Sequence, residues 1–247
     1  MPAARAALAA VAFLTRVPVG RRVALLPADV TRGSALFPLV GAGIGAVAGG
    51  VAALAAHVLP PLTAGGLAVA VSALLTGALH LDALADTTDA LGGMTRERAL
   101  EIMRDHQIGS FGAVALVVDL IVRASVIGGL AANGIGVAAL AAAGACSRAI
   151  APPLAAALPN ARRSTPGHAI THGWSWPTAA AATALGLAIP VLLLGLDGLA
   201  VGGVTAVVAL VLGLFYYRWL GGVTGDCLGA AIEVAETSAL VALLALR

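Results

Sequence analysis

Residues 110–132, SFGAVALVVDLIVRASVIGGLAA, form an almost unbroken apolar segment whose only ionisable side chains are Asp119 and Arg123. A transmembrane helix needs roughly 20 consecutive, predominantly apolar residues, so this segment predicts a membrane-spanning helix. Ionisable side chains at membrane depth are costly and usually face the interior of a helix bundle. Because Asp119 and Arg123 are four residues apart, they share one helix face, and we expect them to form a buried pair.

Further apolar segments lie on both sides of this one, at about 34–57, 63–80, 135–157, 177–195, 199–219 and 226–245. The composition agrees, because 60% of the residues are hydrophobic and only 11% are charged, against roughly 25% in a soluble domain. A shorter apolar run at 6–14 predicts an interfacial or re-entrant helix. The sequence therefore predicts an all-α protein, a polytopic membrane helix bundle of about seven transmembrane helices that forms one domain over residues 1–247.

The basic residues other than histidine are all arginines, 14 in number. Most arginines in or next to the connections between the predicted spans fall on alternate connections: Arg16, Arg21, Arg22, Arg32, Arg96, Arg98, Arg104, Arg162, Arg163 and Arg218, the last of which closes the sixth span. Only Arg247 falls on the other side. The positive-inside rule assigns the arginine-rich side to the cytoplasm, so we expect a multi-pass protein of the cell (inner or plasma) membrane with its active site facing the cytoplasm. No basic stripe is present, so we expect no nucleic-acid partner.

The connection between the second and third spans contains a dense acidic motif, HLDALADTTDALGG at residues 80–93. In helical register Asp82, Asp86 and Asp89 fall at i, i+4 and i+7, which places three carboxylates on one face. Like charges repel unless a cation binds them, and hard divalent cations prefer oxygen ligands. The pattern predicts a Mg²⁺ site at the mouth of the bundle, in a cytoplasmic catalytic loop at about 81–109.

Such a site is suited to phosphoryl transfer, because a bound metal can bridge phosphate oxygens and neutralise developing charge. Either His80 or a spare carboxylate is a candidate acceptor for the proton of an attacking hydroxyl. Arg96, Arg98 and Arg104 can bind phosphates through two N–H groups each. Alternatively, residues 96–105 form a solvated amphipathic helix with internal ion pairs. That alternative explains most charges of the segment but not the carboxylate face before it.

Other polar and small residues lie within the spans. Gly41, Gly45 and Gly49 are four residues apart, which indicates close helix–helix packing rather than a nucleotide-binding loop, because no strand precedes them. Arg148 either pairs within the bundle or reaches a phosphate. Glu233, seven residues after Asp226, is on the same helical face and is a candidate metal ligand or substrate contact.

The acidic motif resembles the signature of the cobalamin synthase family, which are integral membrane adenosylcobinamide-GDP ribazoletransferases. The resemblance continues through RALEIMRD at 98–105 and IGSFG at 108–112, and weaker matches are FLTRVP at 13–18, FPLVG at 37–41 and GVTGD at 222–226. It therefore covers essentially the whole chain in order. Ala83 stands where a glycine is common in the family, but this departure removes no carboxylate.

The resemblance implies the last assembly step of cobalamin biosynthesis. In this family a hydroxyl of α-ribazole or its 5′-phosphate attacks the cobinamide-proximal phosphate of adenosylcobinamide-GDP, which gives adenosylcobalamin or its 5′-phosphate and releases GMP, with Mg²⁺ required. We accordingly expect Asp82, Asp86 and Asp89 to be catalytic and to bind the metal, and His80 to be the base. Expected substrate-binding residues are Arg16, Arg98, Arg104, Asp105 and Asp226.

Two other functions are considered. A CDP-alcohol phosphotransferase also uses aspartates on membrane helices with a metal, but Ala83 and Thr87-Thr88 interrupt its pattern. A small transporter would concentrate its polar residues at the membrane midplane, whereas the dense motif here lies in a connection. The sequence leaves the oligomeric state open, including a homo-oligomer.

Overall fold

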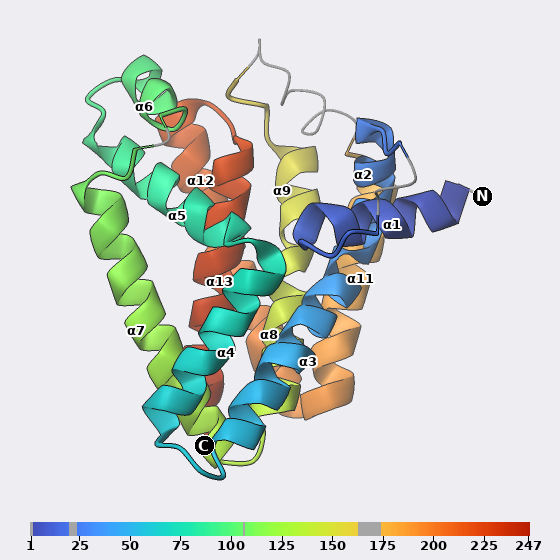
Figure 1. Ribbon diagram of the computed structural model, residues 1–247. Coiled ribbons are helices and arrows are strands. Elements are labelled where there is room, and N and C mark those ends of the chain that lie inside the picture. The colour runs from blue at the N-terminus through green and yellow to red at the C-terminus, as the bar shows by residue number, and fades with distance from the viewer. Residues whose placement is uncertain (1, 20–23, 106, 163–173) are drawn as a thin grey trace.

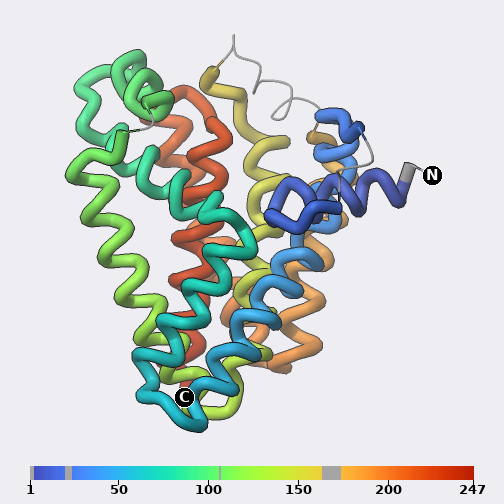
Figure 2. Tube along the Cα trace, viewed as in Figure 1, coloured from blue at the N-terminus to red at the C-terminus, as the bar shows by residue number. Residues whose placement is uncertain are grey.

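The computed structural model describes residues 2–19, 24–105, 107–162 and 174–247, so Arg21, Arg22 and Arg163 lie outside the described residues. Its long helices run side by side in one bundle (Figures 1 and 2). The helices are α1 Pro2–Leu14, α2 Pro27–Gly33, η1 Ser34–Leu36, α3 Phe37–Ala55, α4 Pro61–Thr76, α5 Leu79–Asp89, η2 Ala90–Gly92, α6 Arg96–Ile102, α7 Ser110–Ala132, α8 Gly136–Ala149, α9 Ala151–Ala157, α11 Trp176–Leu194, α12 Leu196–Leu220 and α13 Gly225–Ala245.

The expected all-α membrane bundle is confirmed. Among the described residues, six helical segments are long and apolar enough to cross a membrane, and the bent pair formed by α4 and α5 would make a seventh. The six segments are Pro27–Ala55, Ser110–Ala132, Gly136–Ala157, Trp176–Leu194, Leu196–Leu220 and Gly225–Ala245. The apolar helix α1 lies across the bundle rather than along it (Figure 1), as expected for an interfacial or re-entrant element.

The predicted second span differs from a straight helix. α4 has 16 residues, which gives about 24 Å of helix, less than the roughly 30 Å of a bilayer core. The chain then bends by 92° into α5 through two residues in the left-handed region, Gly77 (φ 66°) and Ala78 (φ 58°). Glycine adopts this conformation freely, whereas alanine does so at a cost, so packing of α5 must hold the bend. The expected loop at 81–109 therefore consists largely of helix, in α5, η2 and α6.

α3 and α8 pack at very short range through the glycines that the sequence singled out. A Cβ atom on Gly41 would collide with the carbonyl oxygen of Gly144, and one on Gly45 would collide with the carbonyl oxygen of Leu140. A Cβ atom on Gly49 would lie 2.7 Å from the backbone of the first turn of α8. The predicted role of the three glycines in helix packing is confirmed.

The interior of the bundle contains a network of ion pairs. Arg123 of α7 contacts Glu233 and lies 2.6 Å from Glu236, both on α13. Arg148 of α8 contacts the second oxygen of Glu236. The expected direct pair between Asp119 and Arg123 is replaced by these contacts, because Asp119 instead accepts a hydrogen bond of 2.6 Å from the Thr237 hydroxyl.

The two ends of the bundle differ in charge. α6, the segment that follows α9 and the end of α12 lie at one end (Figure 1). Together with the residues just after α6 they carry Arg96, Arg98, Arg104, Arg162 and Arg218, five of the arginines expected on the cytoplasmic side. The C-terminus lies at the other end (Figure 2), where Arg247 contacts Asp197. Arg247, the one arginine that the sequence placed on the opposite side of the membrane, is thus paired with an aspartate at the start of α12.

Candidate active site

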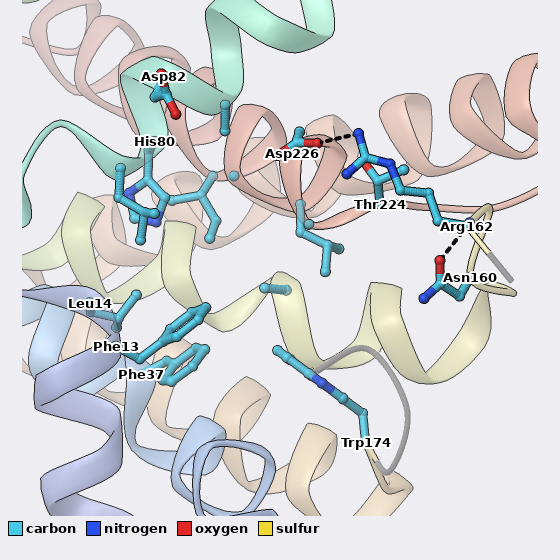
Figure 3. A pocket seen from close by; sticks show the side chains of 17 residues that line it. Phe13, Leu14, Phe37, His80, Asp82, Asn160, Arg162, Trp174, Thr224 and Asp226 are labelled. Carbon is cyan, nitrogen blue, oxygen red and sulfur yellow. Dashed lines mark hydrogen bonds and ion pairs between the residues drawn. The ribbon is translucent and has the colours of Figure 1, made fainter. Parts of the chain in front are cut away.

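A cavity of about 260 Å³ opens between α1, α3, α5, α9 and α13. Its walls combine residues that are far apart in the chain (Figure 3). The residues that line it are Phe13, Leu14, Phe37, Leu79, His80, Asp82, Ala83, Ala151, Asn160, Arg162, Trp174, Thr224, Gly225, Asp226, Leu228, Gly229 and Ile232. Four of the sequence motifs identified above, at 13–18, 37–41, 80–93 and 222–226, therefore meet in one place.

Two helix N-termini contribute to the polar side of this cavity. The bend before α5 places the first turn of α5 there, with Asp82 exposed. The Thr224 hydroxyl accepts a hydrogen bond of 3.1 Å from the backbone N–H of Cys227 and so caps α13, whose first turn carries Asp226. A helix N-terminus has a partial positive charge that favours anions. The arrangement is suited to phosphate groups.

Asp226 and Arg162 form an ion pair on the polar side of the cavity (Figure 3). Arg162 Nη2 lies 2.9 Å from Asp226 Oδ2, with the two side chains 18% and 26% exposed. The backbone N–H of Arg162 donates a 2.7 Å hydrogen bond to Asn160 Oδ1, which holds this segment in place. Within the described part of the chain, Nε and Nη2 of Arg162 have no well-directed hydrogen-bond acceptor, so the guanidinium group can turn its donors to a substrate oxygen.

His80 connects the cavity to the buried ion network. Its Nδ1 atom lies 3.4 Å from Nη2 of Arg148, and Arg148 in turn donates to the Ser147 hydroxyl at 2.9 Å and contacts Glu236. The expected alternatives for Arg148 are thus resolved in favour of pairing within the bundle. Glu233 likewise pairs with Arg123 and does not line the cavity.

The three aspartates predicted to bind Mg²⁺ do lie on one helix, α5, but their environments differ. Asp89 accepts backbone N–H bonds from Gly109 (2.7 Å) and Gly112 (2.8 Å), and so caps the start of α7. Asp86 is half-buried and, like Asp89, is not among the cavity-lining residues. In the described ranges no group of three His, Cys, Asp or Glu side chains is close enough to hold a metal ion. A preformed three-carboxylate site is therefore absent from this part of the chain.

The carboxylates that do face the cavity are Asp82 and Asp226. Mg²⁺ is usually bound by one or two carboxylates together with waters and substrate phosphates, rather than by a complete protein cage. Asp82 and Asp226 are therefore the candidate ligands for a Mg²⁺ ion bound together with a diphosphate substrate. Asp226, expected from the sequence as a substrate contact, is thereby also a candidate metal ligand.

The other expected substrate-binding residues lie outside the cavity lining. Arg16 packs over Gly77 beside the α4–α5 bend. Arg98 is exposed on α6 and pairs with Glu101 at 3.1 Å. Arg104 and Asp105 are exposed in the segment that follows α6. The exposure of Arg98 and its pair with Glu101 support the alternative that residues 96–105 include a solvated helix with internal ion pairs.

Several residues that line the cavity were not expected there from the sequence. Phe13, Phe37 and the capping residue Thr224 were given no individual role, and Trp174 was expected, with Trp176, to form an aromatic belt at the membrane interface, whereas it lines the cavity. Two signals were present in the sequence, because Phe13 and Phe37 begin the FLTRVP and FPLVG stretches and Thr224 lies in GVTGD. An aromatic side chain in an apolar segment gives no indication of whether it packs in a core or faces a ligand.

Comparisons with known proteins agree with this convergence of motifs. The family model described as cobalamin-5-phosphate synthase matches residues 6–244. A protein of Klebsiella pneumoniae (strain 342) named adenosylcobinamide-GDP ribazoletransferase is 41% identical over 240 residues, which cover 96% of this chain and 98% of the relative. A protein with the same name from Azorhizobium caulinodans is 42% identical over 250 residues, covering 96% of this chain and 94% of the relative.

A third relative with that name, from Shigella flexneri, is 41% identical over 244 residues, which cover 96% of this chain and 98% of the relative. No solved structure matches the chain. Among the three functions considered from the sequence, these matches support the synthase and give no support to the CDP-alcohol phosphotransferase or the transporter. Since the matches extend over nearly the full chain at about 40% identity, the chain belongs to the cobalamin-5-phosphate synthase family.

Proposed function

We propose that this protein is an adenosylcobinamide-GDP ribazoletransferase. It joins adenosylcobinamide-GDP to α-ribazole or α-ribazole 5′-phosphate, giving adenosylcobalamin or its 5′-phosphate and GMP. The observation that carries this proposal is the single cavity in which four separated motifs meet, with Asp82, Asp226 and Arg162 on one side. The relatives with this enzyme name cover nearly the same length of chain.

The charge of the cavity favours a divalent cation as part of the substrate complex. Its polar side contains two carboxylates, Asp82 and Asp226, and one guanidinium group, Arg162, so it is formally negative before a substrate enters. A diphosphate adds further negative charge. Because like charges in a partly enclosed site repel, we propose that Asp82 and Asp226 would hold a Mg²⁺ ion together with the diphosphate. When bound, this ion would supply charge neutralisation at the phosphates.

The remaining steps are assigned to residues of the chain. A ribazole hydroxyl attacks the cobinamide-proximal phosphorus, the bond from this phosphorus to the bridging oxygen of the diphosphate breaks, and GMP leaves with that oxygen. The Asp82 carboxylate, exposed in the cavity, receives the hydroxyl proton. Arg162 and the first turn of α13 bind phosphate oxygens. Positioning of the two substrates and electrostatic stabilisation account for most of the catalysis, as in other phosphoryl transfers.

The size of the cavity limits what it can hold. Its volume of about 260 Å³ lies just below the roughly 300–1,000 Å³ of typical ligand pockets. It can hold a nucleoside-sized group together with phosphates, and the much larger corrin ring must rest outside it.

We propose the cell membrane as the location, with the cavity open to the cytoplasm. Five described arginines belong to α6 and the residues after it, the segment after α9 and the end of α12, namely Arg96, Arg98, Arg104, Arg162 and Arg218. These elements lie at one end of the bundle (Figure 1), which favours a cytoplasmic position for that end. Reporter fusions after Gly93 and at the C-terminus are expected to give cytoplasmic and external signals, respectively. The reverse pattern would contradict this orientation.

The proposed activity is tested with the purified full-length protein, adenosylcobinamide-GDP, α-ribazole and Mg²⁺. We expect GMP and adenosylcobalamin in equal amounts, separated and quantified by chromatography. Running the reaction with α-ribazole and with its 5′-phosphate separately gives kcat/KM for each and identifies the better acceptor. GMP release without a cobalamin product, or no consumption of either substrate, would contradict the proposal.

A further inference from the structure

Three aromatic side chains form a wall of the cavity, here called the aromatic wall: Phe13 at the end of α1, Phe37 at the start of α3, and Trp174. The rings of Phe13 and Phe37 are stacked, with centroids 5.6 Å apart and planes at 4°. Trp174 meets Phe37 edge-on, at 6.0 Å and 78°. Figure 3 shows the wall on the side of the cavity opposite Asp82 and Asp226.

Burial differs within the aromatic wall. Phe37 is 1% exposed and is part of the apolar core formed with Leu14, so its packing role alone explains it. Phe13 and Trp174 are only half-buried and still line the cavity. Aromatic surface that borders a cavity without being fully covered can stack against a flat ligand at little cost, since such rings lose few rotamers on binding.

The cavity is therefore divided into an apolar end and a charged end. Leu14 and Leu79 extend the apolar end, while the charged end carries the two carboxylates and Arg162. A ligand that fits both ends has a flat apolar ring at one side and a hydroxyl group at the other. Ribazole, a riboside of a dimethylated benzimidazole, has this form.

We propose that the aromatic wall binds the benzimidazole base of the ribazole acceptor and thereby turns its ribose hydroxyl toward Asp82. This inference rests on the proposed function and deepens it, because it separates the acceptor from the nucleotide within one cavity. Adenosylcobinamide-GDP then places its diphosphate at the charged end, with its guanine base and corrin ring beyond the cavity mouth.

The other flat groups of the reaction fit the wall less well. Guanine carries donors and acceptors around its edge, and burying them without hydrogen bonds is costly, whereas the two phenyl rings of the wall offer none. The corrin ring is too large for about 260 Å³. The dimethylated benzimidazole has one ring-nitrogen acceptor and an otherwise apolar edge and face, so it leaves fewer polar groups unpaired than guanine does and gains most from this surface.

The first test measures binding of α-ribazole alone to the full-length protein by calorimetry, in wild type, Phe13→Ala and Phe13→Leu. We expect Phe13→Ala to weaken binding about tenfold, equivalent to about 1.4 kcal/mol, which is within the range known for a base stacked on an aromatic side chain. Phe13→Leu should fall between the two. Binding of adenosylcobinamide-GDP with Mg²⁺ should stay within about twofold of wild type in all three.

Phe111→Leu is the matched control, because Phe111 is 60% exposed on α7 and lies outside this cavity. Unchanged α-ribazole affinity in Phe13→Ala, in a protein that melts at the wild-type temperature, would overturn the inference, as would a loss confined to adenosylcobinamide-GDP. If Phe13→Ala does not fold, Phe13→Leu and Phe13→Tyr decide in the same way. Turnover of the wild-type protein is measured alongside, so that failure of the subsite is distinguished from failure of the proposed reaction.

A second test compares acceptor bases. Wild type should prefer the α-riboside of dimethylbenzimidazole over that of adenine, whose polar edge the phenyl rings of Phe13 and Phe37 cannot satisfy. In Phe13→Ala the ratio of the two kcat/KM values should fall at least fivefold, because the preferred base loses its stacking partner. An unchanged ratio would show that another part of the protein selects the base.

Discussion

Arg148 Nη2 lies 3.4 Å from His80 Nδ1, and the two residues are 2% and 4% exposed. A guanidinium group can only donate hydrogen bonds, so Nδ1 of His80 must be the acceptor. Neutral His80 then carries its proton on Nε2. In this state the ring has a hydrogen bond to donate and no free lone pair, which argues against the role of general base that the sequence suggested.

His80 is therefore predicted to donate a hydrogen bond to a substrate oxygen. Glutamine can place an amide N–H near the position of Nε2, whereas alanine and asparagine cannot. We expect His80→Gln to retain kcat within about tenfold of wild type, and His80→Ala and His80→Asn to lose about 100-fold, the loss associated with removal of one positioned donor. Steady-state kinetics check this; equal losses in Gln and Ala variants, with disappearance of one limb of the pH–rate profile, would support the base role instead.

Removal of divalent cations is predicted to stop turnover without loosening the fold. In the proposed mechanism the two cavity carboxylates would hold Mg²⁺ only together with a diphosphate, and the described residues contain no group of three metal-binding side chains. Excess EDTA should lower turnover by more than about 100-fold, and added Mg²⁺ should restore it, while the melting temperature stays unchanged. Turnover that persists in EDTA would contradict the metal role, and a large fall in melting temperature would indicate a resident structural ion.

Glu236 is predicted to be essential for stability. It contacts both Arg123 and Arg148 in the bundle interior, and removing one partner of a buried ion pair costs about 3–5 kcal/mol. Glu236→Gln should lower the free energy of unfolding by that amount in detergent. The control is Glu101→Gln, whose pair with Arg98 is 63–65% exposed and should change stability by less than about 1 kcal/mol. Similar effects of the two substitutions would contradict the network.

Asp89 is predicted to act on stability rather than on chemistry. Its carboxylate accepts the N–H groups of Gly109 and Gly112 at the start of α7, and loss of such a cap costs about 1–2 kcal/mol. Asp89→Ala should lower the melting temperature and leave kcat within about threefold, and Asp89→Asn should be milder because its amide oxygen still accepts one bond. If Asp89→Asn folds but has no turnover, the prediction is wrong and Asp89 is again a candidate metal ligand.

Much of the fold could be predicted because its signals are local. Long apolar runs mark the spans, and the four-residue spacing of Gly41, Gly45 and Gly49 marks the close contact with α8. The bend at Gly77 and Ala78 could not be predicted. The apolar character is continuous through residues 63–80, and hydropathy gives no information about the left-handed backbone conformation of these two residues. That bend is what turns the first turn of α5 toward the cavity.

The candidate site was predicted in part. Helical spacing grouped Asp82, Asp86 and Asp89 on one face, but spacing within a helix does not reveal what faces each side chain. In the structure Asp82 shares the cavity with Asp226, a residue more than a hundred positions away, while Asp89 binds backbone groups of α7. Such long-range partners depend on how the helices pack, which a single sequence does not encode in any local pattern.

The most direct test of the cavity as the site of phosphoryl transfer is a single-turnover measurement of GMP release in wild type and Asp82→Asn. The substitution keeps the size of an exposed side chain, so the protein should fold, and adenosylcobinamide-GDP is added at a concentration that saturates the variant, as checked by calorimetry. The account predicts a rate at least about 1,000-fold lower in the variant at saturating α-ribazole and Mg²⁺, with an unchanged melting temperature. GMP release by Asp82→Asn at close to the wild-type rate would contradict it.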